Sequence, residues 1–275
     1  MSKPILSLGF RFPDVYGNIN LLHRFVEDIS CLVVASEMHP NRILYHLLRN
    51  NRNKMEQGIC IYFLSKLCQR EAQLHSPIAP LNNKQRYKQY KRCQSTLLIG
   101  LNSDAVSGWL LLASFFYVHK RYKESILVSE YEFSKCTDEK LYALNIGWTK
   151  DNDEMNKSMS GRKIGIGHIL RELTLDTADF GPYSALIPYE LQSKVAWCHI
   201  PPVVCSYFLK CLCYFHTGDI TSCRNCLRCI EDNMNSIGNI GGLIEYATSY
   251  NCLGVAYELI GDLHQARLNY SFAHF

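Results

Sequence analysis

The chain has 275 residues, of which 47% are hydrophobic and 20% are charged. A chain of this size and composition can bury one large core or two modest ones, which excludes a disordered protein. Its 29 basic and 25 acidic side chains nearly balance, with a formal net charge of +4. The overall charge therefore does not require a nucleic-acid partner.

The sequence also indicates the cellular compartment of the protein. The apolar stretch 203–215 is interrupted by Lys210 and falls short of the roughly 20 residues that cross a bilayer. Residues 1–12 hold no sustained apolar run followed by a cleavage site, so no secretory signal is expected. The 13 cysteines are odd in number and occupy helical apolar positions, as reduced thiols do when they pack as small hydrophobes. We therefore expect a cytoplasmic protein with reduced cysteines and no membrane partner.

Apolar residues recur at helical spacing along most of the chain, and strict alternation over five or more residues is nearly absent. The predicted fold class is therefore all-α. The predicted helices are residues 19–36, 41–52, 57–74, 83–99, 104–119, 122–136, 163–175, 187–197, 202–217, 220–235, 242–260 and 263–275.

Basic side chains crowd the predicted helix 83–99, with Tyr87 and Tyr90 between them. Such a helix can hold the phosphates of a nucleic acid. A solvated helix face with its tyrosines turned inward has the same pattern, and we favour that interpretation. The basic residues are Lys84, Arg86, Lys88, Lys91 and Arg92.

The segment after the predicted helix 122–136 begins with acidic residues and is rich in glycine. Gly161-x3-Gly165-x-Gly167 resembles a phosphate-binding loop, but neither a preceding strand nor a Gly-Lys-Ser/Thr ending is present. We expect no nucleotide site there. The predicted parts of the chain are an N-terminal helical block over residues 1–136, an irregular helical insertion or connector over 137–200, and two helix pairs over 201–275.

Three predicted helix pairs share a pattern of small and aromatic residues. The C-terminal pair carries Tyr250, Leu253, Gly254, Tyr257, Gly261, Asp262, Leu263, Ala266, Tyr270 and Ala273. The pair before it carries Tyr207, Cys211, Tyr214, Gly218, Asp219, Ile220, Cys223 and Leu227. The third carries Trp109, Leu112, Ala113, Phe116, Tyr122 and Ser125, and its turn, Lys120-Arg121, lacks the glycine.

This pattern resembles the tetratricopeptide repeat, in which small residues let two antiparallel helices approach closely. The repeat has a period of about 34 residues. Here Gly218 and Gly261 are 43 residues apart, and Tyr122 and Ile220 are 98 apart. We therefore predict antiparallel helix pairs in an irregular tetratricopeptide-like array with inserted helices. Unrelated helical hairpins remain the alternative interpretation.

Such an array implies a scaffold or adaptor that displays the inner face of its helix pairs to a peptide or helix of another protein. The inner-face candidates are mostly apolar, and their positions lack the basic residues that would capture an acidic C-terminus. They are Leu110, Ser114, Tyr117, Phe208, Leu212, Phe215, Asn251, Val255 and Glu258.

A second resemblance leads to an alternative function. Four segments are similar in order to the helical C-terminal region of invertebrate male-abnormal-21-like proteins, which belong with the cyclic GMP-AMP synthase nucleotidyltransferases. They are residues 84–91, 104–108, 200–204 and 253–254. The resemblance implies a helical appendage of a nucleotidyltransferase, with the basic helix touching nucleic acid. The Gly-Ser loop of the catalytic half is absent from this chain.

Cys223-x2-Cys226-x2-Cys229 is the cluster closest to a zinc motif. On a continuous helix, residues three and six apart are rotated by about 300° and 600°, so the three thiols do not converge. The dispersed histidines show no local signature of a general base or of a cysteine-histidine pair. We therefore predict no metal, no cofactor, no catalytic residues and no enzymatic activity.

The last predicted helix carries a second apolar stripe, formed by Leu268, Phe272 and Phe275. Ala266, Tyr270 and Ala273 already supply the stripe that faces the preceding helix. Large side chains left in water forgo roughly 1.5–3 kcal/mol each relative to full burial. We therefore expect this edge to be covered by a second copy, by a partner, or by a C-terminal extension.

Overall fold

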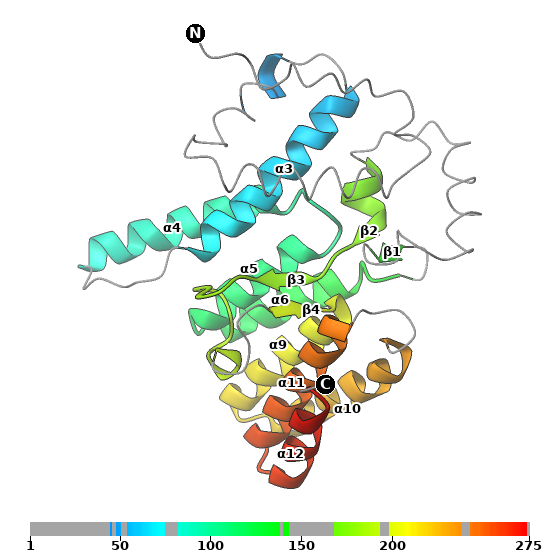
Figure 1. The fold of residues 1–275 in the computed structure, drawn as a ribbon. Coiled ribbons are helices and arrows are strands. Elements are labelled where there is room, and N and C mark those ends of the chain that lie inside the picture. Colours follow the sequence, from blue (N-terminus) through cyan, green and yellow to red (C-terminus); the bar gives the residue numbers. More distant parts are fainter. Residues whose placement is uncertain are drawn as a thin grey trace, which may run out of the picture.

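The computed structural model describes residues 45, 48–50, 54–74, 82–137, 140–142, 168–192, 198–237 and 243–273. Most of that part of the chain is helical, which confirms the helical class (Figure 1). The predicted helix 19–36 lies outside the described residues, as does most of the predicted helix 41–52. None of the described helices has the length together with the apolar character of a membrane span.

The long helices lie close to their predicted bounds. They are α3 (Lys54–Gln73), α4 (Asn83–Gly100), α5 (Ser107–Val118), α6 (Tyr122–Phe133), α9 (Pro202–Thr217), α10 (Ile220–Ile237), α11 (Leu243–Leu259) and α12 (Leu263–Phe272). Capping and first-turn residues mark the start of several of these helices. Asn82 and Gln85 form a capping box at α4, Pro202 opens α9, and the Asp262 carboxylate accepts the Gln265 N–H at the start of α12.

Three helix pairs, α5–α6, α9–α10 and α11–α12, are joined by turns of the same geometry. Each turn places one residue in the left-handed region: Lys120 (φ 60°), Gly218 (φ 81°) or Gly261 (φ 87°). The N–H of that residue donates to the carbonyl three residues back, and the next N–H donates to the carbonyl five residues back. The six donor–acceptor pairs are Lys120–Tyr117, Arg121–Phe116, Gly218–Phe215, Asp219–Tyr214, Gly261–Glu258 and Asp262–Tyr257.

Small residues lie between the two helices of each pair at equivalent positions. One stands seven residues before the turn residue and the other five after it. The pairs are Ala113 and Ser125, Cys211 and Cys223, and Gly254 and Ala266, all buried. In the first pair the Ser125 hydroxyl donates to the Ala113 carbonyl at 2.9 Å. In the last, a Cβ at Gly254 would overlap the Tyr270 ring.

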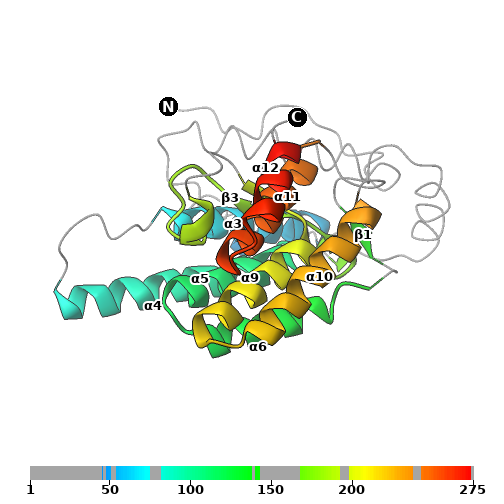
Figure 2. The ribbon, with the colours of Figure 1, turned by 90° about the horizontal axis from the view of Figure 1, so that it is seen from below.

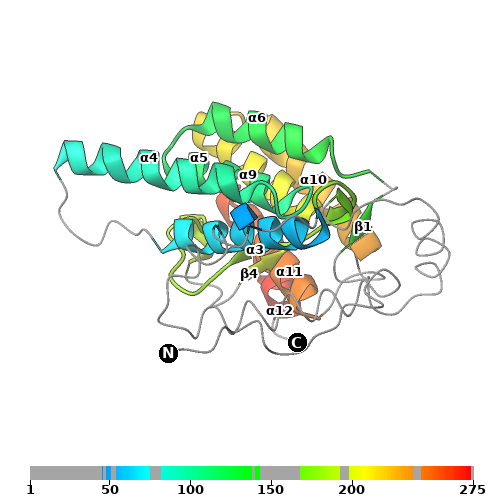
Figure 3. The same ribbon diagram turned by 90° about the horizontal axis from the view of Figure 1, so that it is seen from above.

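The pairs pack in chain order. Helix α9 lies against both α5 and α6, and α11 lies against both α9 and α10. Helices α3 and α4 form a further adjacent pair, and α4 packs on α5. Figure 2 shows α6, α9 and α10 side by side on one face, and Figure 3 shows α3 and α4 on the opposite side of the body. The N-terminal part of α4 projects beyond the other described elements in both views.

The insertion contains short strands as well as helical turns. Strands β1 (Leu141–Tyr142) and β2 (Thr174–Leu175) pair in parallel, and β3 (Ala178–Phe180) and β4 (Cys198–Ile200) pair antiparallel. A π-helix, η4, spans Ile169–Leu173, and a single 3-10 turn, η5, spans Tyr189–Leu191.

The predicted helix 163–175 is helical over residues 168–173, mainly as η4, and its last two residues form β2 instead. The predicted helix 187–197 is wrong in its described part, because it contains only η5 before residue 193. Pro188, directly before η5, has extended backbone angles (φ −51°, ψ 136°), so no helix runs through it. The apolar residues of this segment pack on the helix pairs instead of forming a helix stripe.

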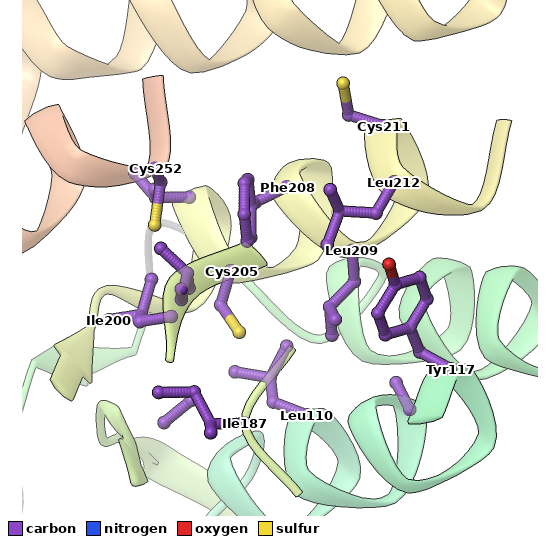
Figure 4. Packing of buried hydrophobic residues seen from close by; sticks show 14 of the residues in the cluster. Leu110, Tyr117, Ile187, Ile200, Cys205, Phe208, Leu209, Cys211, Leu212 and Cys252 are labelled. Carbon is purple, nitrogen blue, oxygen red and sulfur yellow. The ribbon is translucent and has the colours of Figure 1, made fainter. Parts of the chain in front are cut away.

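One hydrophobic core joins residues of all three predicted parts of the chain. It contains Phe115 of α5, Phe180 of β3 and Phe208 of α9, each at most 1% exposed. Figure 4 shows Leu110 next to Ile187, with Cys205 and Leu209 of α9 beside them. The predicted boundaries at 137 and 201 therefore mark changes of local structure, and the packing continues across them.

A buried polar network ties α3 to the α4–α5 junction and to β2. The Lys66 ammonium contacts the Asp176 carboxylate at 2.7 Å, and the Gln69 amide donates to the Gly100 carbonyl at 2.7 Å. Asp104 accepts backbone N–H bonds from Val106, Ser107 and Asp176. These contacts satisfy polar groups that are costly to bury alone.

The close approach at Gly254 gives a stability prediction. Gly254→Leu must displace the Tyr270 ring, so the variant should lose about 1–3 kcal/mol of unfolding free energy in urea melts. Ser271→Leu also enlarges a small side chain, at an exposed position of α12, and is the matched control. Equal stability of Gly254→Leu and wild type would contradict the packing.

Glu132 of α6 is buried, and burial raises the pKa of its carboxyl to about 8. The folded state therefore holds this proton up to about pH 8, whereas the unfolded chain releases it near pH 4.5. The resulting stability is complete below pH 4.5 and is lost as the pH rises through 8. Glu132→Gln should flatten this fall between about pH 5 and 8, as measured by chemical unfolding. Parallel pH profiles for wild type and variant would refute the assignment.

Candidate functional site on the inner face of the helix pairs

Most of the predicted inner-face residues belong to the hydrophobic core. They lie on α5, α9 and α11, the first helices of the three pairs, and α9 touches both of the others. Leu110, Ser114, Phe208 and Leu212 are fully buried. The remainder are Tyr117 (5% exposed), Val255 (3%) and Asn251 (7%), the half-buried Phe215 and the exposed Glu258.

The chain itself covers this face. Residues 178–192, which we term the covering segment, run over it: β3 packs on α5, and η5 packs on α11. Strand β4, the partner of β3, also packs on α11. The Ser114 hydroxyl donates to the Leu186 carbonyl at 2.5 Å, and the Leu186 and Leu191 side chains are buried. The inner face is therefore filled from within.

Gln73 at the end of α3 holds the covering segment from the other side. Its side-chain amide donates to the Asp179 carbonyl at 2.9 Å and accepts the Gly181 N–H at 3.0 Å. Its backbone carbonyl accepts the Ala185 N–H at 2.9 Å. Docking of a foreign peptide at the buried inner-face residues stays a prediction, and it requires this segment to move.

A polar cluster closes one end of the covered face. The Tyr117 hydroxyl donates to the Glu190 carboxylate at 2.6 Å and lies 2.9 Å from His216 Nε2. The Tyr122 ring stacks on His216. Burial, together with the Glu190 hydrogen bond, raises the pKa of Tyr117 well above its ordinary value. Tyr117 therefore remains a neutral donor that anchors the covering segment.

The outer side of the covering segment presents two tyrosines to solvent. Tyr183 is 98% exposed and has a left-handed backbone (φ 62°), and Tyr189 is 80% exposed. A non-glycine residue in this region costs about 1–2 kcal/mol, and the Ser184 N–H bond to the Gly181 carbonyl closes the turn that contains Tyr183.

The predicted basic side chains of α4 are all exposed. The Arg92 guanidinium pairs with Glu71 of α3 at 2.8 Å. The predicted inward direction is correct for Tyr90, whose ring lies 4.9 Å from Phe115, and wrong for Tyr87, which is 65% exposed. The reason is that Tyr87 belongs to the N-terminal part of α4, Asn83–Gly100, and this part of the helix projects beyond the other described elements (Figure 1).

The apolar edge of α12 is present in the structure. Leu268 and Phe272 are each 43% exposed, and the Phe272 ring packs on Tyr250 at 5.2 Å. Phe275 lies outside the described residues. On the opposite side of the helix, the Tyr270 hydroxyl donates to the Glu258 carboxylate at 2.6 Å.

Cys223, Cys226 and Cys229 lie on the continuous helix α10, as predicted. Among the described residues, no group of three histidine, cysteine or acidic side chains is arranged to hold a metal ion. The glycines at 161, 165 and 167 lie outside the described part of the chain. The sequence patterns did not reveal the Lys66–Asp176 ion pair or the contact of Glu190 with Tyr117 and His216, because their members are far apart in the chain.

Comparison of the chain with protein-family models, with curated proteins and with solved structures finds no match. The functional argument therefore rests on the geometry of the helix pairs and of their surfaces.

Proposed function

We propose that the chain is a non-catalytic protein-interaction scaffold or adaptor built from tetratricopeptide-like helix pairs. One observation carries the proposal. Three helix pairs have the same turn geometry, and each pair has buried small residues seven positions before and five positions after the turn residue. Lys120 gives further support for the proposal. It adopts the same left-handed conformation as Gly218 and Gly261, although it is not a glycine, the residue that adopts this conformation most easily.

The packing order supports the same proposal. In a stacked array, the first helix of each pair contacts both helices of the pair before it. Helices α9 and α11 make these contacts with the preceding pairs. The covering segment and the two small sheets are the insertions that interrupt the array.

Two pairs of titratable groups fit a scaffold because each pair connects two elements of the fold. Lys66 and Asp176 join α3 to the residue after β2, and Tyr117 and Glu190 join α5 to η5. Such groups stabilise a fixed arrangement, whereas a catalytic site directs its titratable groups at a substrate.

With the inner face filled, the apolar edge of α12 is the docking surface we propose for a protein partner or a second copy. Leu268 and Phe272 stand four residues apart on one helix face, the spacing that anchors a helix-to-helix contact. Covering them would remove two large apolar side chains from water.

Leu268→Asp combined with Phe272→Asp tests this surface. The double variant should stay folded but melt below wild type, because both side chains are 43% exposed and Phe272 loses its contact with Tyr250. It should lower the light-scattering mass of the chain or release the proteins that copurify with it from source cells. Leu127→Asp, at a 64% exposed leucine of α6, should change neither. A wild-type chain that is monomeric and with which no other protein copurifies would contradict the proposal.

A second candidate function is the helical appendage of a male-abnormal-21-like or cyclic GMP-AMP synthase-like nucleotidyltransferase, with α4 touching nucleic acid. The favouring observation is the exposed basic face of α4. Lys84, Lys88 and Lys91 follow at helical spacing, so their ammonium groups share one face, and the helix contains no acidic residue.

Binding of the chain to a duplex of about 20 base pairs tests this candidate. The affinity should fall steeply with salt, and replacing Lys84, Lys88 and Lys91 with alanine should reduce the salt slope by about one for each phosphate that the variant no longer neutralises. Arg224→Ala with Arg228→Ala, at exposed positions of α10, is the matched control. Undetectable binding at low salt would remove the candidate.

A further inference from the structure

Two cysteines face each other across the α9–α10 pair. The Sγ atoms of Cys211 and Cys223 lie 3.0 Å apart, and both residues are fully buried. A disulfide joins its sulfur atoms at about 2.0 Å, so bond formation requires an approach of about 1 Å. A rotation of the two side chains can supply a movement of this size while the helices keep their places.

The fold keeps the two thiols in contact. Cys211 stands where the other pairs have Ala113 and Gly254, and Cys223 stands where they have Ser125 and Ala266. These are the positions at which buried small residues lie between the paired helices. Cysteine at both positions of one pair therefore places two thiols in reach of each other whenever the pair is folded.

We propose that Cys211 and Cys223 are a redox modification site: hydrogen peroxide converts them to a reversible disulfide that locks the α9–α10 pair. The chemistry needs no residue beyond the two thiols. The pair is independent of the docking surface on α12, so the inference does not rest on the proposed function.

The reaction balances in two steps. The Cys223 sulfur, as thiolate, attacks peroxide; an S–O bond forms, the O–O bond breaks, and the hydroxide released takes up a proton to leave as water. The Cys211 sulfur then attacks the Cys223 sulfenic acid, an S–S bond forms, the S–O bond breaks, and the second water leaves with the Cys211 proton. Two thiols are oxidised, and one peroxide is reduced to two waters.

The surroundings favour Cys223 as the first sulfur to react. The hydrogen bond with the Cys211 thiol lowers the pKa of Cys223. Burial raises the pKa of Cys213 to about 11 and that of Cys226 to about 12. Because the thiolate is the nucleophile, these two neighbours should react more slowly with peroxide.

The expected consequence is a more rigid centre of the molecule. Helix α9 packs on α5, α6, α10 and α11, so it links all three pairs. The bond would close a loop between residues 12 apart in sequence, which reduces the freedom of the unfolded chain. The thermal midpoint should therefore rise, by about 5 °C, on oxidation and return on reduction.

Peptide mapping after peroxide treatment tests the proposal. The folded chain is treated, blocked with an alkylating reagent and digested without reductant. Trypsin releases residues 211–224 as one peptide, which also contains Cys213. The peptide should carry one alkyl group, on Cys213, in place of three, and its mass should be two hydrogen atoms below that of the singly alkylated dithiol. Chymotryptic cleavage after Tyr214 or Phe215 should leave its two halves joined.

Cysteine-to-alanine variants show which two cysteines form the disulfide. In Cys213→Ala the linkage and the rise in thermal midpoint should persist. In Cys223→Ala, which copies the residue of the α11–α12 pair, both should vanish while the reduced variant stays folded. Linkage through Cys213, or alkylation of both Cys211 and Cys223 at peroxide doses that oxidise the other cysteines, would overturn the proposal.

Discussion

Small side chains between antiparallel helices set the spacing on which the rest of the structure depends. Ala113, Cys211 and Gly254 allow the second helix of each pair to lie close to the first, and the turn then needs only one left-handed residue. Close pairs leave the large residues of α5, α9 and α11 directed at one common face. That face is apolar and must be covered, because an open surface of this kind would lose its hydrophobic stabilisation.

The covering segment meets that requirement and also changes which surfaces are free. Its apolar side chains enter the core, while its polar backbone groups are satisfied by Ser114 and Gln73. In the scaffold that we propose, the covering segment takes the place at which a foreign peptide would dock. The exposed surfaces of the described residues include the edge of α12, the N-terminal part of α4 and the tyrosines of the covering segment.

The sequence was sufficient to predict the long helices, because apolar periodicity over ten or more residues is a strong local signal. It also placed the three turns, two of them from glycine. It could not reveal β3 and β4, since strands of three residues carry no periodic pattern. The burial of Ser114 and Tyr117 depends on residues 72 and 73 positions away, and no local pattern records such a contact. Tyr87 was misjudged because the length of α4 beyond the body depends on tertiary packing.

The same sequence separations determine the order in which the protein can be built. Each helix pair closes through contacts about a dozen residues apart, and local contacts of this kind form fast. The contact of the covering segment with α5 joins Ser114 to Leu186, which are 72 residues apart. During synthesis α5 therefore emerges with its apolar face bare, and chaperone binding or aggregation competes with folding until residue 192 has left the ribosome.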